Sequence, residues 1–422
     1  MSTHSFEILA TTLFVLAILH TFLVKQFSNL AHRFPQGSVG ENFFHLLSEV
    51  EVVFGLWAGI YVACLSFFDS SNRAISYLES LNMTEPIFVF VIMVMASTKP
   101  VLELAESLLF TVTKILPMPK AVGFFFSVMI FGPLLGSFIT EPAAMTVTAL
   151  TLSQYFYSQK ISQKLSYAIL GLLLVNVSIG GVLTPFAAPP VVMVAAKWNW
   201  DLMFMLTHFG WKAFIAVVLS TSLVGLFFRK EISKFKIEKK SQGAMKTPLW
   251  VKLTHVLFLY AVVKSAHHPH LFVGFFMFFM GFVTATKEYQ LALKIREGLL
   301  VGFFLAGLVV IGSMQAWWLK PLLEQLSNLQ MYLGGIALTA VTDNAALTYL
   351  ASLVTDLSDE AKYAIVAGAV VGGGLTVIAN APNPIAFGVL NKHFGKDGIS
   401  PLGLFKAALL PTAIAALCFY LG

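Results

Sequence analysis

The chain has 422 residues, of which 57% are hydrophobic, 14% are aromatic and only 11% are charged. Ordinary soluble domains carry about 25% charged residues, and a soluble fold of this length could not hide so much apolar surface. The composition therefore excludes a soluble enzyme, a disordered scaffold and a nucleic-acid-binding protein. It predicts an all-α polytopic membrane protein.

Apolar stretches of about 20 residues predict ten membrane spans in chain order. They lie near 6–25, 50–68, 86–113, 164–198, 203–228, 250–266, 270–286, 298–318, 363–393 and 403–421. Two further apolar segments, 121–157 and 331–354, are interrupted at their centres by polar residues or proline. Because their arms are short for full spans, we predict two re-entrant hairpins whose tips stop at mid-membrane depth.

The net charge of the chain lies in one segment. Residues 229–252 contain eight Lys and Arg residues against Glu231 and Glu238, which accounts for the whole formal charge of +6. Since basic residues favour the cytoplasmic side of a bilayer, we predict a cytoplasmic linker resting on anionic lipid. Both termini then lie on the periplasmic side of a bacterial inner membrane. If either hairpin crossed fully, later loops would change sides and this charge bias would weaken.

The linker separates a first half, 1–228, from a second half, 253–422. Each half contains three spans, a hairpin, a broken span and a final span, and the halves begin on opposite sides of the membrane. Three pairs of segments match in the same order. They are Lys99–Glu103 with Lys320–Glu324, Thr140–Thr146 with Thr342–Thr348, and Gly180–Pro190 with Gly372–Pro382. Inverted-topology repeats with interrupted helices are typical of secondary transporters, whose sites lie at the repeat interface.

The paired hairpin tips and the two Gly-Gly-x-Leu-Thr broken spans resemble the ion transporter superfamily. That group includes D-type sodium/proton antiporters, arsenite pumps and dicarboxylate/sodium symporters, and the chain most resembles its sodium/proton antiporter branch. The resemblance covers most of 86–420. It implies alternating access of the elevator type, with a scaffold and a moving part, often in a homodimer. Anion-carrying members have Ser-Asn-Thr at the tips, whereas these tips are Thr-Glu-Pro and Thr-Asp-Asn.

Two acidic residues occupy equivalent positions at the tips, Glu141 and Asp343. A charged side chain at the bilayer centre costs at least about 2.5–3.5 kcal/mol on insertion scales, so such residues persist where they pair, titrate or bind an ion. Two converging carboxylates favour a proton or a bound cation, which is the competition that proton/cation exchange needs. The alternative is that each acid caps the helix that follows it.

Neutral oxygens accompany the two acids and suit a hard cation such as sodium. Thr140, Thr342 and Asn344 flank the tips, and Thr184, Thr376, Asn380 and Asn383 line the broken spans. The alternative is that they satisfy backbone groups freed by the helix breaks.

A third set of charged residues lies in the predicted third span. Lys99 and Glu103 are four residues apart, hence on one helix face, and Glu106 follows them. They form either a structural ion pair or a proton relay.

These features predict a secondary active transporter that exchanges sodium (or lithium) for protons, with no resident cofactor and no enzymatic activity. The alternative is a sodium- or proton-coupled anion or dicarboxylate transporter, because helix N-termini in the hairpins can hold an oxyanion. The expected partners are Na+ or Li+, protons, the lipid bilayer and a second copy of the chain. A non-transporting scaffold has no need of inverted breaks.

Overall fold

The computed structural model describes residues 3–238, 246–395 and 398–422, and every regular element in these ranges is a helix. Residues 239–245 of the predicted linker 229–252 lie outside the described ranges. Seven of the described helices are long and apolar enough to cross a bilayer, or eight if α4 (Ser71–Ser80) and α5 (Thr84–Ala96), bent by 65° at their junction, cross as one. The protein is therefore an all-α polytopic membrane protein, as predicted.

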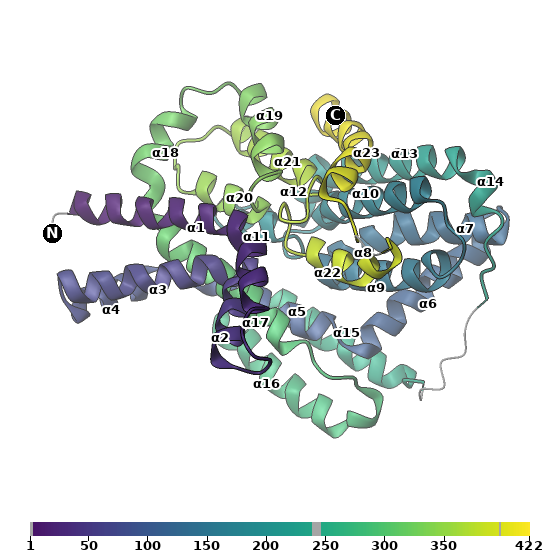
Figure 1. Ribbon diagram of the computed structural model, residues 1–422, viewed down its shortest axis with the longest axis horizontal. Helices are drawn as coiled ribbons and strands as arrows, with labels where there is room; N and C mark the ends of the chain where they lie inside the picture. The colour runs from purple at the N-terminus through teal and green to yellow at the C-terminus, as the bar shows by residue number, and fades with distance from the viewer. Residues whose placement is uncertain (1–2, 239–245, 396–397) are drawn as a thin grey trace.

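The helices pack into two groups, and each group contains helices from both sequence halves (Figure 1). The peripheral group comprises α1 (Thr3–Ala31), α2 (Val39–Leu47), α3 (Val50–Phe68), α4, α5, α15 (Leu249–Lys264), α16 (Pro269–Ala285), α17 (Ile295–Gly312) and α18 (Ala316–Leu323). The hairpin group comprises α7 (Lys120–Phe126), α8 (Gly132–Ile139), α9 (Glu141–Leu152), α10 (Gln163–Gly180), α11 (Pro189–Ala195), α12 (Leu202–Met205), α13 (Trp211–Phe227), α14 (Arg229–Ile232), α19 (Asn328–Thr339), α20 (Asn344–Ser352), α21 (Asp359–Gly372), α22 (Asn383–Leu390) and α23 (Pro401–Leu421). Between them, α6 (Lys99–Ile115) packs against α15 on one side and against α7 and α9 on the other.

The predicted third span, 86–113, is wrong as a single helix. It is divided into α5 and α6 at Ser97 and Thr98. The physical reason is Pro100, which lacks an N–H and whose ring would clash with the carbonyl of Ala96 in a continuous helix. Consequently Lys99, Glu103 and Glu106 belong to a separate helix, and α6 is not among the helices that are long and apolar enough to span.

Each predicted hairpin is a pair of helices joined by a short turn. In 121–157, α7 and α8 are connected by a π-helical turn into one arm of 20 residues, and α9 follows after Thr140 alone. This first arm is longer than predicted. A helix of 20 residues suffices to cross a bilayer. In 331–354 the arms are short, with 12 residues in α19 and 9 in α20.

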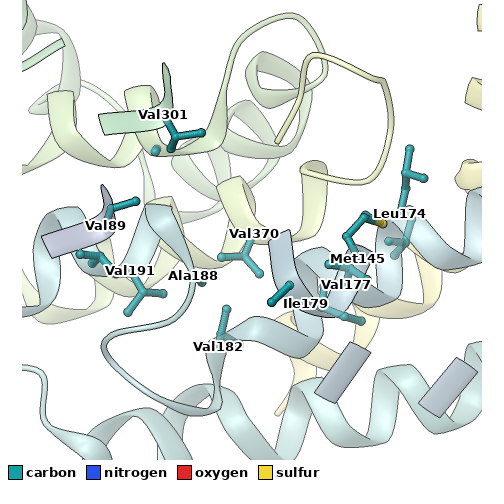
Figure 2. Packing of buried hydrophobic residues seen from close by; sticks show 14 of the residues in the cluster. Val89, Met145, Leu174, Val177, Ile179, Val182, Ala188, Val191, Val301 and Val370 are labelled. Carbon is teal, nitrogen blue, oxygen red and sulfur yellow. The ribbon is translucent and has the colours of Figure 1, made fainter. Parts of the chain in front are cut away.

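The two broken spans exchange partners between the sequence halves. After the break that follows α10, helix α11 packs against α20 of the second half. After the break that follows α21, helix α22 packs against α9 of the first half. Figure 2 shows apolar side chains on both sides of the first break, Val182 and Ala188, in one core with Val370 of α21. This reciprocal packing brings both breaks and both hairpin tips to the centre of the hairpin group.

Gly307 permits a close crossing of two helices in the peripheral group. A Cβ atom added to Gly307 of α17 would overlap the backbone of Phe54 and Gly55 in α3. Small residues permit such close approach between membrane helices. We expect Gly307→Ala to destabilise the protein by about 1–3 kcal/mol, measured as a lower midpoint of thermal unfolding in detergent. The matched control is Gly59→Ala in α3, where no atom lies within 4 Å of the added Cβ. Equal midpoints for the two variants would contradict this packing argument.

Candidate functional site

Glu141 lies at the centre of the hairpin group with no exposure to solvent. It is the first residue of α9, where the chain turns back at the tip of the first hairpin. Its Oε2 accepts a hydrogen bond of 2.9 Å from Nδ2 of Asn380, which lies in the second broken span. Its Oε1 has no protein hydrogen-bond partner. A carboxylate from one sequence half therefore meets an amide from the other half inside the membrane.

The break after α10 provides the space for this carboxylate. A Cβ atom on Gly181 would overlap Glu141 Oε1, so an alanine there requires the carboxylate to move. If the cation/proton exchange expected from the sequence uses this carboxylate, Gly181→Ala should weaken it at least about tenfold while the protein still folds, because the change displaces a single side chain. Gly388→Ala on α22 is the control, since no atom lies within 4 Å of its added Cβ. If the Gly181→Ala variant had the same cation dependence as the wild type, the position of the Glu141 carboxylate would not matter for exchange.

Thr140 connects the two arms of the first hairpin through an unusual backbone conformation. Its φ of 76° and ψ of 149° fall near a region that is essentially reserved for glycine. The residue is buried, and its Oγ1 has no hydrogen-bond partner within the protein. Such strain costs on the order of 1–3 kcal/mol and is concentrated at functional sites. The tip is thus held in a high-energy conformation beside Glu141.

Three asparagines contribute further buried oxygens. Asn344 donates its backbone N–H to the carbonyl of Ala379 at 3.1 Å, while neither polar atom of its side chain has a partner. Asn383 donates to the carbonyls of Gly373 and Thr376 at 2.7 and 2.8 Å, which leaves its Oδ1 without a partner. The Oδ1 of Asn380 is also without a partner.

Five buried oxygens at the tips and at the second break lack a hydrogen-bond partner, and oxygens of these types suit a small hard cation. They are Thr140 Oγ1, Glu141 Oε1, Asn344 Oδ1, Asn380 Oδ1 and Asn383 Oδ1, and each of the five residues is at most 2% exposed. A buried polar atom without a partner costs about 1–3 kcal/mol. A cation bound by carboxylate and amide oxygens removes that cost. In the described part of the chain no group of three or more His, Cys, Asp and Glu residues is placed to hold a metal ion.

Asp343 has different contacts from Glu141. Its Oδ1 accepts hydrogen bonds from the backbone N–H groups of Ala345 at 2.8 Å and Ala346 at 3.3 Å, so Asp343 is the N-cap of α20. It also lines an apolar cavity of about 260 Å3 between α1, α3, α17 and α18 on one side and α19 and α20 on the other. In this structure the Asp343 carboxylate has the contacts of a helix cap.

The threonines of the broken spans bind backbone carbonyls of the hairpins. Thr184 Oγ1 donates to the carbonyl of Ser137 at 2.5 Å, and Thr376 Oγ1 donates to the carbonyl of Ala340 at 2.9 Å. Thr342, in the turn after α19, donates to the carbonyl of Leu338 at the end of that helix. All three hydroxyls therefore donate to backbone carbonyls near the breaks and tips.

Ser137 is a buried site residue that the sequence did not indicate. Its Oγ donates to the carbonyl of Gly180 at 2.7 Å and accepts from the N–H of Leu183 at 2.9 Å. It therefore fixes the first break against α8, one turn before the tip. No pattern in the sequence distinguishes this serine from others, because its partners are backbone groups 43 and 46 residues away.

Lys99 and Glu103 form an ion pair that ties two helices together. Their charged atoms are 3.7 Å apart, and Lys252 of α15 approaches the same Glu103 carboxylate at 3.0 Å. Glu106 lies partly buried on the same helix. The sequence did not predict the participation of Lys252, which lies at the end of the linker. The Glu103 carboxylate thus anchors α6 to α15.

Comparison with known proteins places the chain in a family. Residues 5–422 match the family described as "Putative Na+/H+ antiporter", so the chain belongs to that family. No curated protein matches the chain. Among solved structures it is similar to the YdaH transporter of Alcanivorax borkumensis, with 11% sequence identity, a TM-score of 0.46, and coverage of 88% of this chain and 96% of that one.

Proposed function

We propose that this member of the Na+/H+ antiporter family exchanges sodium (or lithium) for protons, with Glu141 as the shared site of cation and proton. The observation that carries the proposal is the environment of Glu141. One carboxylate oxygen accepts a hydrogen bond from Asn380, and the other is buried without a partner in the protein. An isolated carboxylate buried in apolar surroundings is unfavourable. It is therefore expected to be occupied either by a cation or by a proton, and never by both.

The charge balance at Glu141 gives a stoichiometry. Bound Na+ neutralises the carboxylate, and a proton neutralises it after Na+ leaves, so the site crosses the membrane with the same charge in both directions. Asp343 remains bound to the amides of its own helix and takes no part in the exchange. One titrating acid therefore implies electroneutral exchange of one Na+ for one proton.

The movement that alternates access is proposed to occur between the two helix groups. The hairpin group carries Glu141, and it meets the peripheral group through α5, α6, α17 and α18. In the elevator scheme that the sequence resemblance implies, the hairpin group moves and the peripheral group is the fixed scaffold, which would form the contact surface of a homodimer. We further propose a bacterial inner membrane with both termini on the periplasmic side, because the basic linker favours the cytoplasmic side.

The alternative anion transporter is less well supported by the hairpin tips. An oxyanion would bind the free N–H groups at the start of α9 or α20. At α20 these amides already bind the Asp343 carboxylate. At α9 the first residue is Glu141 and the second is Pro142, which has no N–H. Both tips therefore present negative charge where the anion would have to bind.

An exchange assay separates the two functions. Everted membrane vesicles holding an acidic interior are exposed to Na+, Li+, K+ or Ca2+, and proton release is followed with a pH-sensitive dye. We expect release with Na+ or Li+, at a rate unaffected by an imposed membrane potential. In parallel, proteoliposomes are tested for sodium-driven uptake of radiolabelled succinate. Succinate uptake without cation-induced proton release would establish the anion transporter instead, and a rate that follows the membrane potential would refute the one-to-one stoichiometry.

A further inference from the structure

A cavity lined by charged and aromatic residues lies in the hairpin group, apart from Glu141. It has a volume of about 480 Å3 and opens between α13, α19, α21 and α23. Its lining includes Asn328 and Asp359, where α19 and α21 begin, and Tyr420 at the end of α23. The cavity therefore lies at one end of the group, the end that the proposed topology places in the periplasm. Several of its residues are tyrosines, the side chains typical of lipid headgroup depth.

Lys212 is the buried cation of this cavity. Its side chain lines the cavity although the residue is only 7% exposed. Its Nζ donates a hydrogen bond of 2.9 Å to the hydroxyl of Tyr363 and lies 4.3 Å from the centre of the same ring. None of the ion pairs in the described part of the chain includes Lys212. An ammonium has three N–H donors, so this one retains donors for an anionic group in the cavity.

The rim of the cavity carries the opposite charge. Asp359 is exposed and pairs with Lys362 at 2.8 Å, which leaves Glu360 as the rim carboxylate without an ion pair in the described structure. The two negative charges of Asp359 and Glu360 balance the two positive charges of Lys362 and Lys212. A ligand that fits this arrangement has an anionic group for the buried lysine and a cationic group for the rim, with no net charge.

Apolar side chains extend from the cavity along the two flanking helices. Leu329 and Leu333, one turn apart on α19, are 45% and 52% exposed, and Leu417 of α23 is 59% exposed. The two helices are held together beside the cavity, because the Tyr332 hydroxyl donates to the carbonyl of Ala416 and its ring stacks on Tyr420. In a membrane protein these leucines face acyl chains.

We propose that this cavity binds the headgroup of a zwitterionic phospholipid with a protonated amine, of the phosphatidylethanolamine class. The phosphate accepts hydrogen bonds from the Lys212 ammonium, the amine donates to the Glu360 carboxylate, and the acyl chains lie along α19 and α23. The site lies between four helices of the hairpin group, so the bound lipid holds their periplasmic ends together.

Native mass spectrometry of the delipidated full-length protein tests this site. Dioleoyl-phosphatidylethanolamine is titrated against wild type, and we expect one molecule to remain bound per chain. Lys212→Met should weaken this binding about 10- to 100-fold, the effect of losing a charge-assisted hydrogen bond, and Lys212→Arg should restore it. Glu360→Gln should remove the preference over dioleoyl-phosphatidylglycerol while binding of both lipids persists. Lys264→Met, at the exposed end of α15, is the control and should bind as wild type.

Three results would overturn the proposal. The first is wild-type binding of phosphatidylethanolamine by Lys212→Met. The second is equal binding of the two lipids by the wild-type protein. The third is competition by free phosphoethanolamine at the lipid's own concentration, which would identify a soluble ligand in place of a lipid. Because no readout depends on transport, the outcome is independent of the exchange assay. If the Lys212→Met variant does not fold, the lipid preference of the Glu360→Gln variant still tests the proposal.

Discussion

Replacing Glu141 with glutamine is expected to reduce sodium-induced proton release by at least about 100-fold. Glutamine keeps the size of the side chain and can still accept a hydrogen bond from Asn380, so the packing around the tip is preserved. It has neither a charge to hold Na+ nor a site for the exchanged proton. The loss of an interaction with a charged group costs up to about 3 kcal/mol, which already corresponds to a factor of about 100. The measurement is dye-monitored exchange in everted vesicles, at matched expression.

The control for this prediction is the acid at the other tip. Asp343→Asn should exchange at a rate within about twofold of wild type, because asparagine and aspartate are equally good N-caps. Asp343→Ala removes the cap and should cost about 1 kcal/mol of stability. If instead Asp343→Asn abolished exchange and Glu141→Gln retained it, the roles assigned to the two tips would have to be reversed.

The different contacts of the two acids have a local cause, which is the position of each acid relative to the start of its helix. Asp343 is the N-cap of α20, a position that aspartate favours, whereas the N-cap of α9 is Thr140 and Glu141 is the first residue of the helix. The repeat alignment treated the tips as equivalent and predicted two converging ion-binding carboxylates. It could not show that α9 begins at its acid, Glu141, whereas α20 begins one residue after the matched acid, Asp343.

Other features of the site depend on contacts that the sequence does not encode locally. The hairpin and broken-span patterns, with glycine and threonine at the breaks, predicted which segments carry Glu141, Asn380 and Asn344. Hydropathy did not reveal the division between α5 and α6, because the residues on both sides of Pro100 are apolar enough to be taken as one span. The attachment of Ser137 to the first break and of Lys252 to Glu103 involves residues far apart in the chain, so neither could be predicted without the fold.

The second large effect is expected at Asn380. Its Nδ2 is the hydrogen-bond donor to Glu141, and its Oδ1 is one of the neutral oxygens proposed to bind the cation. Asn380→Ala removes both contributions and leaves the carboxylate charge in place. We therefore expect exchange to persist, with a sodium concentration for half-maximal rate raised about 10- to 100-fold, since hydrogen bonds to charged groups contribute about 1.5–3 kcal/mol.

A second buried asparagine separates this effect on affinity from an effect on folding. Asn176 on α10 is equally buried, but its amide donates to the Met129 carbonyl and to Thr221, and its Oδ1 accepts from Ser220. Asn176→Ala should therefore lower the thermal unfolding midpoint in detergent and leave the sodium dependence of exchange unchanged. Asn380→Ala should show the reverse pattern. Parallel changes in both properties for both variants would mean that Asn380 acts through packing, and the cation site would then have to be sought among the other oxygens around Glu141.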